Sequence, residues 1–262
     1  MNLKQDRIEE ILRNGYQLDF ANVFNKAFEN YKKIALYAGL MIFVFMVILM
    51  TIIASVGISL FGIAALSQES FQELSLNLKN ISGVYLFIYM GISIFFSSLI
   101  SPLQAGLIKM AYCAERDEEF HVSTVFSYYN TKHFVQIFLA TFLILISSQG
   151  IETALNYSGI ILVGPMISVA ISFFTILTIP LIIFSDLNAV DAIKYSFSIV
   201  LKQPLILLGL ILVAIIGSMV GFIGCCIGVF FTLPFMYSMY YAMYNEIIGF
   251  DNEEEIETSN LL

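Results

Sequence analysis

Charged and metal-binding side chains are scarce in this chain of 262 residues. Asp, Glu, Lys and Arg make up 12% of the residues, roughly half of the fraction usual in a soluble domain, and there are two His, three Cys and no Trp. Neither His121 nor His133 belongs to a His-Glu-x-x-His pattern, so we expect neither a metal site nor a cofactor. The three Cys lack the spacing of a secreted disulfide framework.

The common sequence signatures of catalysis are also missing from the chain. It has no P-loop, no Gly-x-Ser-x-Gly motif and no Gly-x-Gly-x-x-Gly motif. No long apolar run carries an ionisable residue near its middle, where intramembrane enzymes and ion-coupled pumps usually place one. We therefore expect a protein that is not an enzyme, and we expect no nucleic-acid partner.

The chain has instead five long apolar blocks without Asp, Glu, Lys or Arg, whereas a membrane-spanning helix needs only about 20 apolar residues. The last block, 203–245, is long enough for two helices joined by a glycine-rich turn at 217–228. This pattern predicts an all-α, multi-pass membrane protein. Its six transmembrane helices are expected at about 34–58, 81–108, 134–150, 159–184, 204–223 and 225–247.

Amphipathic segments precede three of these spans and indicate an internal repeat. Asp19–Phe28 aligns without gaps with Asn188–Phe197, each with a capping residue followed by apolar residues at helical spacing, and 122–132 occupies the equivalent place before the third span. We expect these segments to lie as helices in the plane of the membrane surface. They either brace the transmembrane hairpins or act as a lateral gate or lipid-sensing collar.

Prolines in the second helix of each hairpin support the same repeat. They are expected to bend these helices, because proline removes a backbone donor and clashes with the preceding turn; they are Pro102, Pro180 and Pro234. The predicted unit is an interfacial amphipathic helix followed by a transmembrane hairpin. Three such pseudo-repeats, at about 19–110, 120–185 and 188–248, form a single membrane domain, 19–248.

The basic residues are distributed unequally around the predicted spans. Eleven of the twelve Lys and Arg lie on one side of the membrane in this arrangement, and Lys79 is the exception. By the positive-inside rule, this places the N-terminal segment 1–18, the amphipathic helices and the acidic tail 249–262 in the cytoplasm. We expect Glu152 in the outer turn between the third and fourth spans, and the acidic run 115–119 in a solvated loop.

Four tyrosines recur at helical spacing in the last predicted span. Tyr237, Tyr240, Tyr241 and Tyr244 follow an i, i+3, i+4, i+7 pattern near its cytoplasmic end. Such tyrosines are typical of the aromatic belt at a membrane interface. The alternative is a pocket in which their phenol groups orient an amphipathic ligand.

Residues 15–32, 101–106, 192–197 and 232–235 resemble a broad group of bacterial multi-pass membrane proteins of unknown function. The chain is also similar to the membrane domain fused to some glycerophosphodiester phosphodiesterases. The resemblance implies the same membrane fold and a location in the bacterial inner membrane.

Two functions are compatible with these features. The first is a scaffold or accessory subunit that contacts membrane lipids and reaches a protein partner through 1–18 or the acidic tail. The second is a carrier or scramblase-like protein for lipids or small amphiphilic molecules. The sequence leaves the oligomeric state open.

Overall fold

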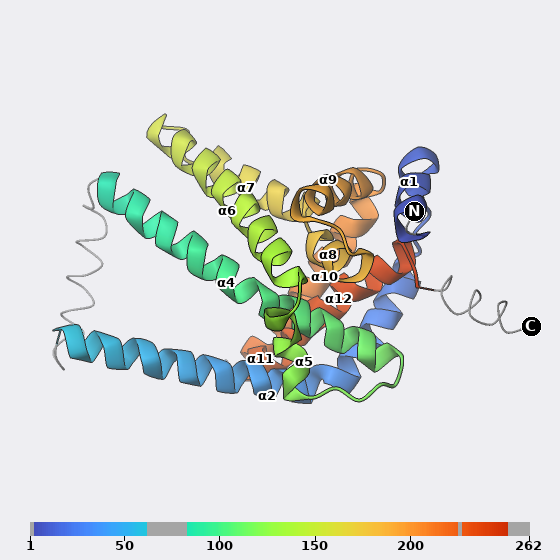
Figure 1. Ribbon diagram of the computed structural model, residues 1–262, viewed down its shortest axis with the longest axis horizontal. Helices are drawn as coiled ribbons and strands as arrows, with labels where there is room; N and C mark the ends of the chain where they lie inside the picture. The colour runs from blue at the N-terminus through green and yellow to red at the C-terminus, as the bar shows by residue number, and fades with distance from the viewer. Residues whose placement is uncertain (1–2, 62–82, 225–226, 251–262) are drawn as a thin grey trace, which may run out of the picture.

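The computed structural model describes residues 3–61, 83–224 and 227–250, and these residues form helices joined by turns, with no strand among them (Figure 1). The α-helices are α1 (Leu3–Asn14), α2 (Phe20–Phe61), α4 (Gly83–Glu115), α5 (Val122–Phe126), α6 (His133–Tyr157), α7 (Val163–Phe174), α8 (Thr178–Ser185), α9 (Ala189–Val200), α10 (Pro204–Met219), α11 (Gly228–Thr232) and α12 (Pro234–Ile247). Short 3-10 helices, η2 (Ser127–Asn130) and η3 (Val220–Gly224), follow α5 and α10.

Five helical segments of the described chain are long and apolar enough to cross a membrane, so this is a helical protein of the multi-pass membrane class. They are Phe20–Ser59, Leu86–Glu115, His133–Tyr157, Val163–Ser185 and Pro204–Ile223. The sixth predicted span, 225–247, is divided into α11 and α12 at Leu233, and its residues 225–226 lie outside the described residues. The 14 residues of α12 are about 21 Å long at 1.5 Å per residue, which is shorter than a bilayer core of about 30 Å.

The first amphipathic segment is the beginning of α2, where we expected a separate helix. Val23, Ala27, Ile34 and Ala38 are each 0% exposed, and Asn30 lies on the same face at 3%. This helical spacing continues past the predicted boundary near residue 33 without Gly or Pro, and α2 packs there on α12 and α4. Packing along one face therefore keeps the surface segment and the membrane span in a single helix.

The third amphipathic segment does form a helix of its own. The carboxamide of Asn188 accepts a hydrogen bond from the backbone N–H of Asp191 at 3.0 Å and caps the start of α9. A turn separates α9 from α10, whose first residue is Pro204. Proline is favoured at this position because the N–H that it lacks has no partner there in any case.

The helices pack closely at one end of the molecule and diverge at the other. In Figure 1, α8, α9, α10 and α12 gather with α1, whereas α2, α4 and α6 extend away from this group and separate. Large apolar side chains on the diverging parts are half exposed or more, among them Ile48, Ile53, Phe87 and Phe96. In a bilayer these side chains contact lipid, whereas in water they would form an aggregation-prone surface.

The three repeat prolines have different surroundings. Pro102 lies inside α4, which continues through it, and the hydroxyl of Ser101 donates to the Ser98 carbonyl at 2.7 Å. That carbonyl is the one left without its helical donor by Pro102. Pro180 and Pro234, in contrast, stand at or near the start of α8 and α12, directly after an interruption of the helix.

A serine from a neighbouring element covers the break between α7 and α8. The hydroxyl of Ser196 in α9 accepts a hydrogen bond from the Leu177 N–H at 3.1 Å and donates to the Phe174 carbonyl at 2.9 Å. Ser196 is fully buried. Through these two bonds α9 holds the interrupted helix in place.

Candidate functional site

A cavity of about 170 Å³ lies at the meeting point of α4, α6, α7, α8 and α12, and we call it the chamber. Six of its eleven lining residues are neutral and polar, and together they come from all five helices. These residues are Gln104, Thr141, Ser172, Thr175, Thr178 and Tyr240. The rest of the lining is formed by Ile and Leu side chains.

Most polar groups of the chamber have no protein partner. The hydroxyl of Thr178 has none although this residue is only 1% exposed. Within the described part of the chain, the side chains of Gln104, Ser172 and Tyr240 also make no hydrogen bond. Thr178 is buried, Tyr240 is partly buried, and Gln104 and Ser172 are exposed. Because buried polar groups are almost always hydrogen-bonded, the Thr178 hydroxyl calls for a partner, and the other three side chains can bond to the same molecule without giving up an existing bond.

An apolar groove of about 220 Å³ adjoins the chamber between α2 and α4, and we call it the α2–α4 groove. Met41 and Phe45 line it from α2, and Leu103 and Leu107 line it from α4. Its remaining walls come from α5, from Leu233 and from Tyr237. Gln104 borders both the groove and the chamber, so the two cavities are direct neighbours.

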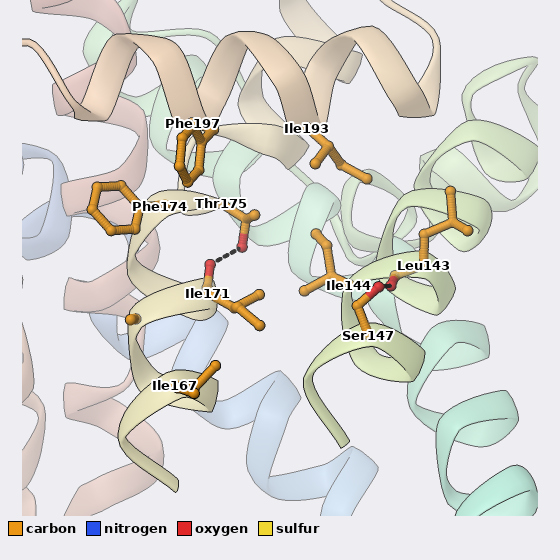
Figure 2. A pocket seen from close by; sticks show the side chains of 10 residues that line it. Leu143, Ile144, Ser147, Ile167, Ile171, Phe174, Thr175, Ile193 and Phe197 are labelled. Carbon is orange, nitrogen blue, oxygen red and sulfur yellow. Dashed lines mark hydrogen bonds between the residues drawn. The ribbon is translucent and has the colours of Figure 1, made fainter. Parts of the chain in front are cut away.

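A second apolar groove, of about 480 Å³, lies between α6 and α7 beneath α9 and is called the α6–α7 groove (Figure 2). It contains two hydroxyl groups, and both are bonded to their own helices. Ser147 donates to the Leu143 carbonyl at 2.7 Å, and Thr175 donates to the Ile171 carbonyl at 2.8 Å. The wall is therefore apolar in effect, and this groove adjoins the chamber at Thr175 and Ile144.

No Asp, Glu, Lys, Arg or His is among the described residues that line the chamber and the two grooves. A phosphate or carboxylate placed there would have no counter-charge, and burying such an ion without a partner costs several kcal/mol or more. The arrangement can hold a neutral polar group in the chamber and apolar chains in the grooves. It offers no nucleophile paired with a base and no set of metal ligands.

The structure divides the four candidate tyrosines between two environments. Tyr237 borders the α2–α4 groove and Tyr240 borders the chamber, with their ring centres 6.3 Å apart. Tyr241 and Tyr244 are 1% and 0% exposed and pack in the core around Phe184. The pattern on α12 places all four tyrosines on one broad side, but α8 covers part of that side.

The Tyr244 hydroxyl shares a hydrogen bond of 2.7 Å with the Ser185 hydroxyl, which satisfies both groups inside the core. Only Tyr237 and Tyr240 therefore reach a cavity, and ligand binding by the tyrosines stays a prediction. The sequence alone did not single out Gln104 and Thr178 as site residues. Their position relative to the repeat prolines could have marked them, because Gln104 comes two residues after Pro102 and Thr178 two residues before Pro180.

Thr178 and Thr232 each stand two residues before a repeat proline, where a hydroxyl can cover a carbonyl that the proline leaves without its donor. Thr232 does bond to backbone, donating to the carbonyl of Ser218 at 2.6 Å and lying 3.2 Å from that of Val229. The Thr178 hydroxyl makes no such bond and borders the chamber. The difference arises because Ser196 already bonds to the backbone at that break.

A network of carboxylates and amides joins α2, α4 and α12 at the end of the bundle near α1. Glu115, expected in a solvated loop, is the last residue of α4 and accepts hydrogen bonds from Asn30 at 3.0 Å and Asn245 at 2.8 Å. Glu246 accepts one from Asn22 at 2.9 Å and is paired with Lys26. The expectation failed for Glu115 because residues distant in sequence surround it.

Two further carboxylates have specific partners. Glu152, expected in a turn, lies inside α6 and accepts a hydrogen bond from Ser168 of α7 at 2.8 Å, so it links the two helices of this hairpin. Asp186, just after α8, is held by Lys132 at 2.5 Å and His133 at 2.9 Å. The hydrogen bond from Lys132, with that from His133, lowers the pKa of Asp186 below its usual value.

Comparison with known proteins adds no assignment to this geometry. No family model matches the chain, and neither a curated protein nor a solved structure matches it.

Proposed function

We propose that the protein binds lipids or small amphiphilic molecules inside the membrane and moves them, as a carrier or scramblase-like protein. The observation that carries this proposal is the uncharged polar chamber, with unpartnered donors and acceptors, that continues into an apolar groove on either side. A polar cavity bordered by apolar ones matches the two parts of an amphiphile. The lack of lining charges also fits a carrier that is not driven by protons or ions.

The structure gives less support to a scaffold that works through residues 1–18. The apolar side of α1 is already used inside the protein, because Ile8 and Ile11 are 0% and 1% exposed. On its exposed side, Arg7 pairs with Glu10 and Arg13 pairs with Glu9. A partner would therefore meet a charged surface on α1, and the tail 251–262 lies outside the described residues.

We also propose the architecture of six spans in three repeats. The helix that contains each repeat proline is followed by a residue with a left-handed backbone: Asp117 (φ 53°), Asp186 (φ 57°) and Gly249 (φ 81°). Asp117 and Gly249 each come fifteen residues after the proline, Pro102 or Pro234. Asp186 comes six residues after Pro180, so the equivalent spacing relates the first repeat to the third.

Ion pairs recur at the same points of the first two repeats. Lys33 lies 2.5 Å from Asp117, and Lys132 lies 2.5 Å from Asp186. In each case a lysine near the start of a hairpin is paired with the aspartate that follows its second helix. This correspondence is independent of the apolar composition that makes membrane sequences resemble one another.

The grooves correspond as well. The α2–α4 groove is closed by Val125 and Phe126 of α5, and the α6–α7 groove is closed by Ile193 and Phe197 of α9. In both, the amphipathic helix of the following repeat covers the hairpin. The start of α2 packs on α12 in the same way, which relates the third repeat to the first.

The sixth span of this architecture consists of α11 and α12 together. Gly228 to Ile247 is 20 residues, about 30 Å of helix, which matches the bilayer core. Gly221 and Gly228 approach so closely that a side chain on either would meet the backbone of the other, which makes the hairpin with α10 tight. With six spans and the basic residues inside, both termini are cytoplasmic in a bacterial inner membrane.

Transbilayer exchange of fluorescent lipids in proteoliposomes tests the proposed function. We expect the wild-type protein to accelerate exchange over protein-free vesicles, and Ser172→Phe, which fills the chamber, to slow it at least fivefold. Ser198→Phe is the matched control, because Ser198 is a partly exposed serine of α9 that lines neither the chamber nor a groove. Wild-type vesicles no faster than empty ones would refute transport.

A further inference from the structure

We infer that the occupant of the chamber and its grooves is a neutral lipid with two acyl chains and a small hydroxyl-bearing head, of the diacylglycerol class. This inference rests on the proposed function, because it names the molecule that the same cavities take. It is carried by the chemistry of the chamber, by the number of grooves and by the absence of lining charge in the described residues.

The chamber offers the hydrogen bonds that a glycerol diester needs. Such a molecule has one hydroxyl, which donates and accepts, and two ester carbonyls, which only accept. The Gln104 side chain supplies an amide donor and a carbonyl acceptor, and the hydroxyls of Thr178 and Tyr240 each donate or accept. All three lack a protein partner in the described chain, so binding would satisfy them without breaking an existing bond.

The lining favours a neutral head over a phosphate. Two of the lysines have carboxylate partners outside the chamber and the grooves, since Lys26 is paired with Glu246 and Lys132 with Asp186. Neither of the two lysines lines the chamber or either groove. A phospholipid head in the chamber would lose its hydration with no positive group in return, which opposes its binding.

The grooves favour two chains over one. The α2–α4 groove leaves the chamber at Gln104 of α4, and the α6–α7 groove leaves it at Ile144 of α6 and at Thr175, directly after α7. Figure 2 shows Ile193 and Phe197 of α9 directed into the second groove, opposite Ile144 and Ile171. One chain would occupy one groove and leave the other apolar surface unused, whereas two chains bury both.

Photo-crosslinking tests the inference. The full-length protein in detergent micelles is labelled with a diacylglycerol that carries a photoreactive group in one chain, in competition with unlabelled dioleoylglycerol, monooleoylglycerol or dioleoylphosphatidylglycerol. We expect dioleoylglycerol to compete at a concentration at least tenfold lower than the other two. Labelled peptides should come from the helices that line the two grooves.

Variants connect the label to the chamber. Thr178→Val and Tyr240→Phe keep the side-chain shape and remove one hydroxyl each, so we expect both to fold and to lower diacylglycerol affinity about tenfold. Thr51→Val is the matched control, since the Thr51 hydroxyl is exposed on α2 and bonds to its own helix at 2.8 Å. Melting temperatures of all three variants in lipid-free detergent verify that the fold is intact.

The outcomes separate the inference from the function on which it rests. If monooleoylglycerol or the phospholipid competes as well as dioleoylglycerol, and the chamber variants still reduce labelling, amphiphile binding holds and the neutral two-chain ligand is refuted. If the chamber variants label like the wild type, or if labelling maps outside the grooves, both proposals fail. Selective competition by dioleoylglycerol together with loss in the chamber variants supports both.

Discussion

Replacing Gly106 in α4 by Ala should displace α5, because no side-chain movement can make room for the new methyl group. A Cβ at this position would lie 2.5 Å from both the carbonyl carbon and the Cα of Val125, and closer still to its carbonyl oxygen. These are backbone atoms, so α5 must move by roughly 1 Å to restore ordinary van der Waals distances of about 3.5 to 4 Å. Val125 is 5% exposed and Phe126 closes the α2–α4 groove, so the movement would open that groove.

The expected magnitude follows from two opposing terms. Overpacking of this kind costs about 1–3 kcal/mol. Alanine in a helix interior recovers about 0.5–1 kcal/mol relative to glycine. The net loss, up to about 2.5 kcal/mol, corresponds to a melting temperature lower by up to about 10 °C in a chain of this size.

Gly91 provides the matched comparison, because it lies in the same helix and a Cβ there would meet nothing within 4 Å. Thermal unfolding of both variants, followed by size-exclusion chromatography in detergent, should show Gly106→Ala less stable than wild type and Gly91→Ala equal or more stable. Photo-labelling of the α2–α4 groove should fall in the first variant alone. Equal melting temperatures for the two variants would refute the close approach of α4 and α5.

Three other changes test the contacts that hold the bundle together. Ser196→Ala should cost about 2–4 kcal/mol in unfolding free energy, because it leaves the two backbone groups at the break between α7 and α8 unpartnered. Ser198→Ala removes a partly exposed hydroxyl that bonds only to its own helix, and it should leave the melting temperature within error. Folding lowers the pKa of Asp186, so its contribution to stability is complete above the ordinary aspartate pKa of about 3.9 and is lost as the pH falls through the lower value of the folded state. Asp186→Asn, which tolerates the same left-handed backbone, should therefore flatten the acid limb of a plot of melting temperature against pH, and an unchanged limb would contradict this role. Lys26→Met should lower the unfolding free energy by up to about 1 kcal/mol, because the lysine is partly exposed. A double-mutant cycle with Glu246→Gln should show coupling between the two sites. Additive effects of the two substitutions would mean that the ion pair contributes nothing to stability.

Much of the fold could be predicted from composition and periodicity. Runs of more than 20 residues without charge have few stable conformations in hydrocarbon, because every backbone N–H and C=O must be bonded within the segment. Helix is therefore the state that these runs adopt, and five of the six predicted spans coincide with long helices. The cap at Asn188 and the start of α10 at Pro204 follow from local chemistry in the same way.

The candidate site was harder to find because its residues are ordinary when they are considered one at a time. Thr178 precedes a proline, where a hydroxyl usually bonds to its own helix, and Gln104 is a single amide in an apolar span. Their importance comes from helices far apart in sequence that turn free donors and acceptors toward one cavity. Tyr240 was identified by its spacing, but the same spacing also selected Tyr241 and Tyr244, which are core residues.

The sequence by itself therefore determined that this is a helical membrane protein, because the solvent in which such apolar runs are stable allows little else. It also placed five of the six predicted spans, which coincide with long helices. Only the tertiary structure decided that α2 continues through its predicted boundary, that α12 stands apart from α11, and that Glu115 lies in a network of amides. It alone placed a chamber with unpartnered hydroxyls between two grooves, because the partners of a side chain depend on which helices meet, and distant packing selects those helices.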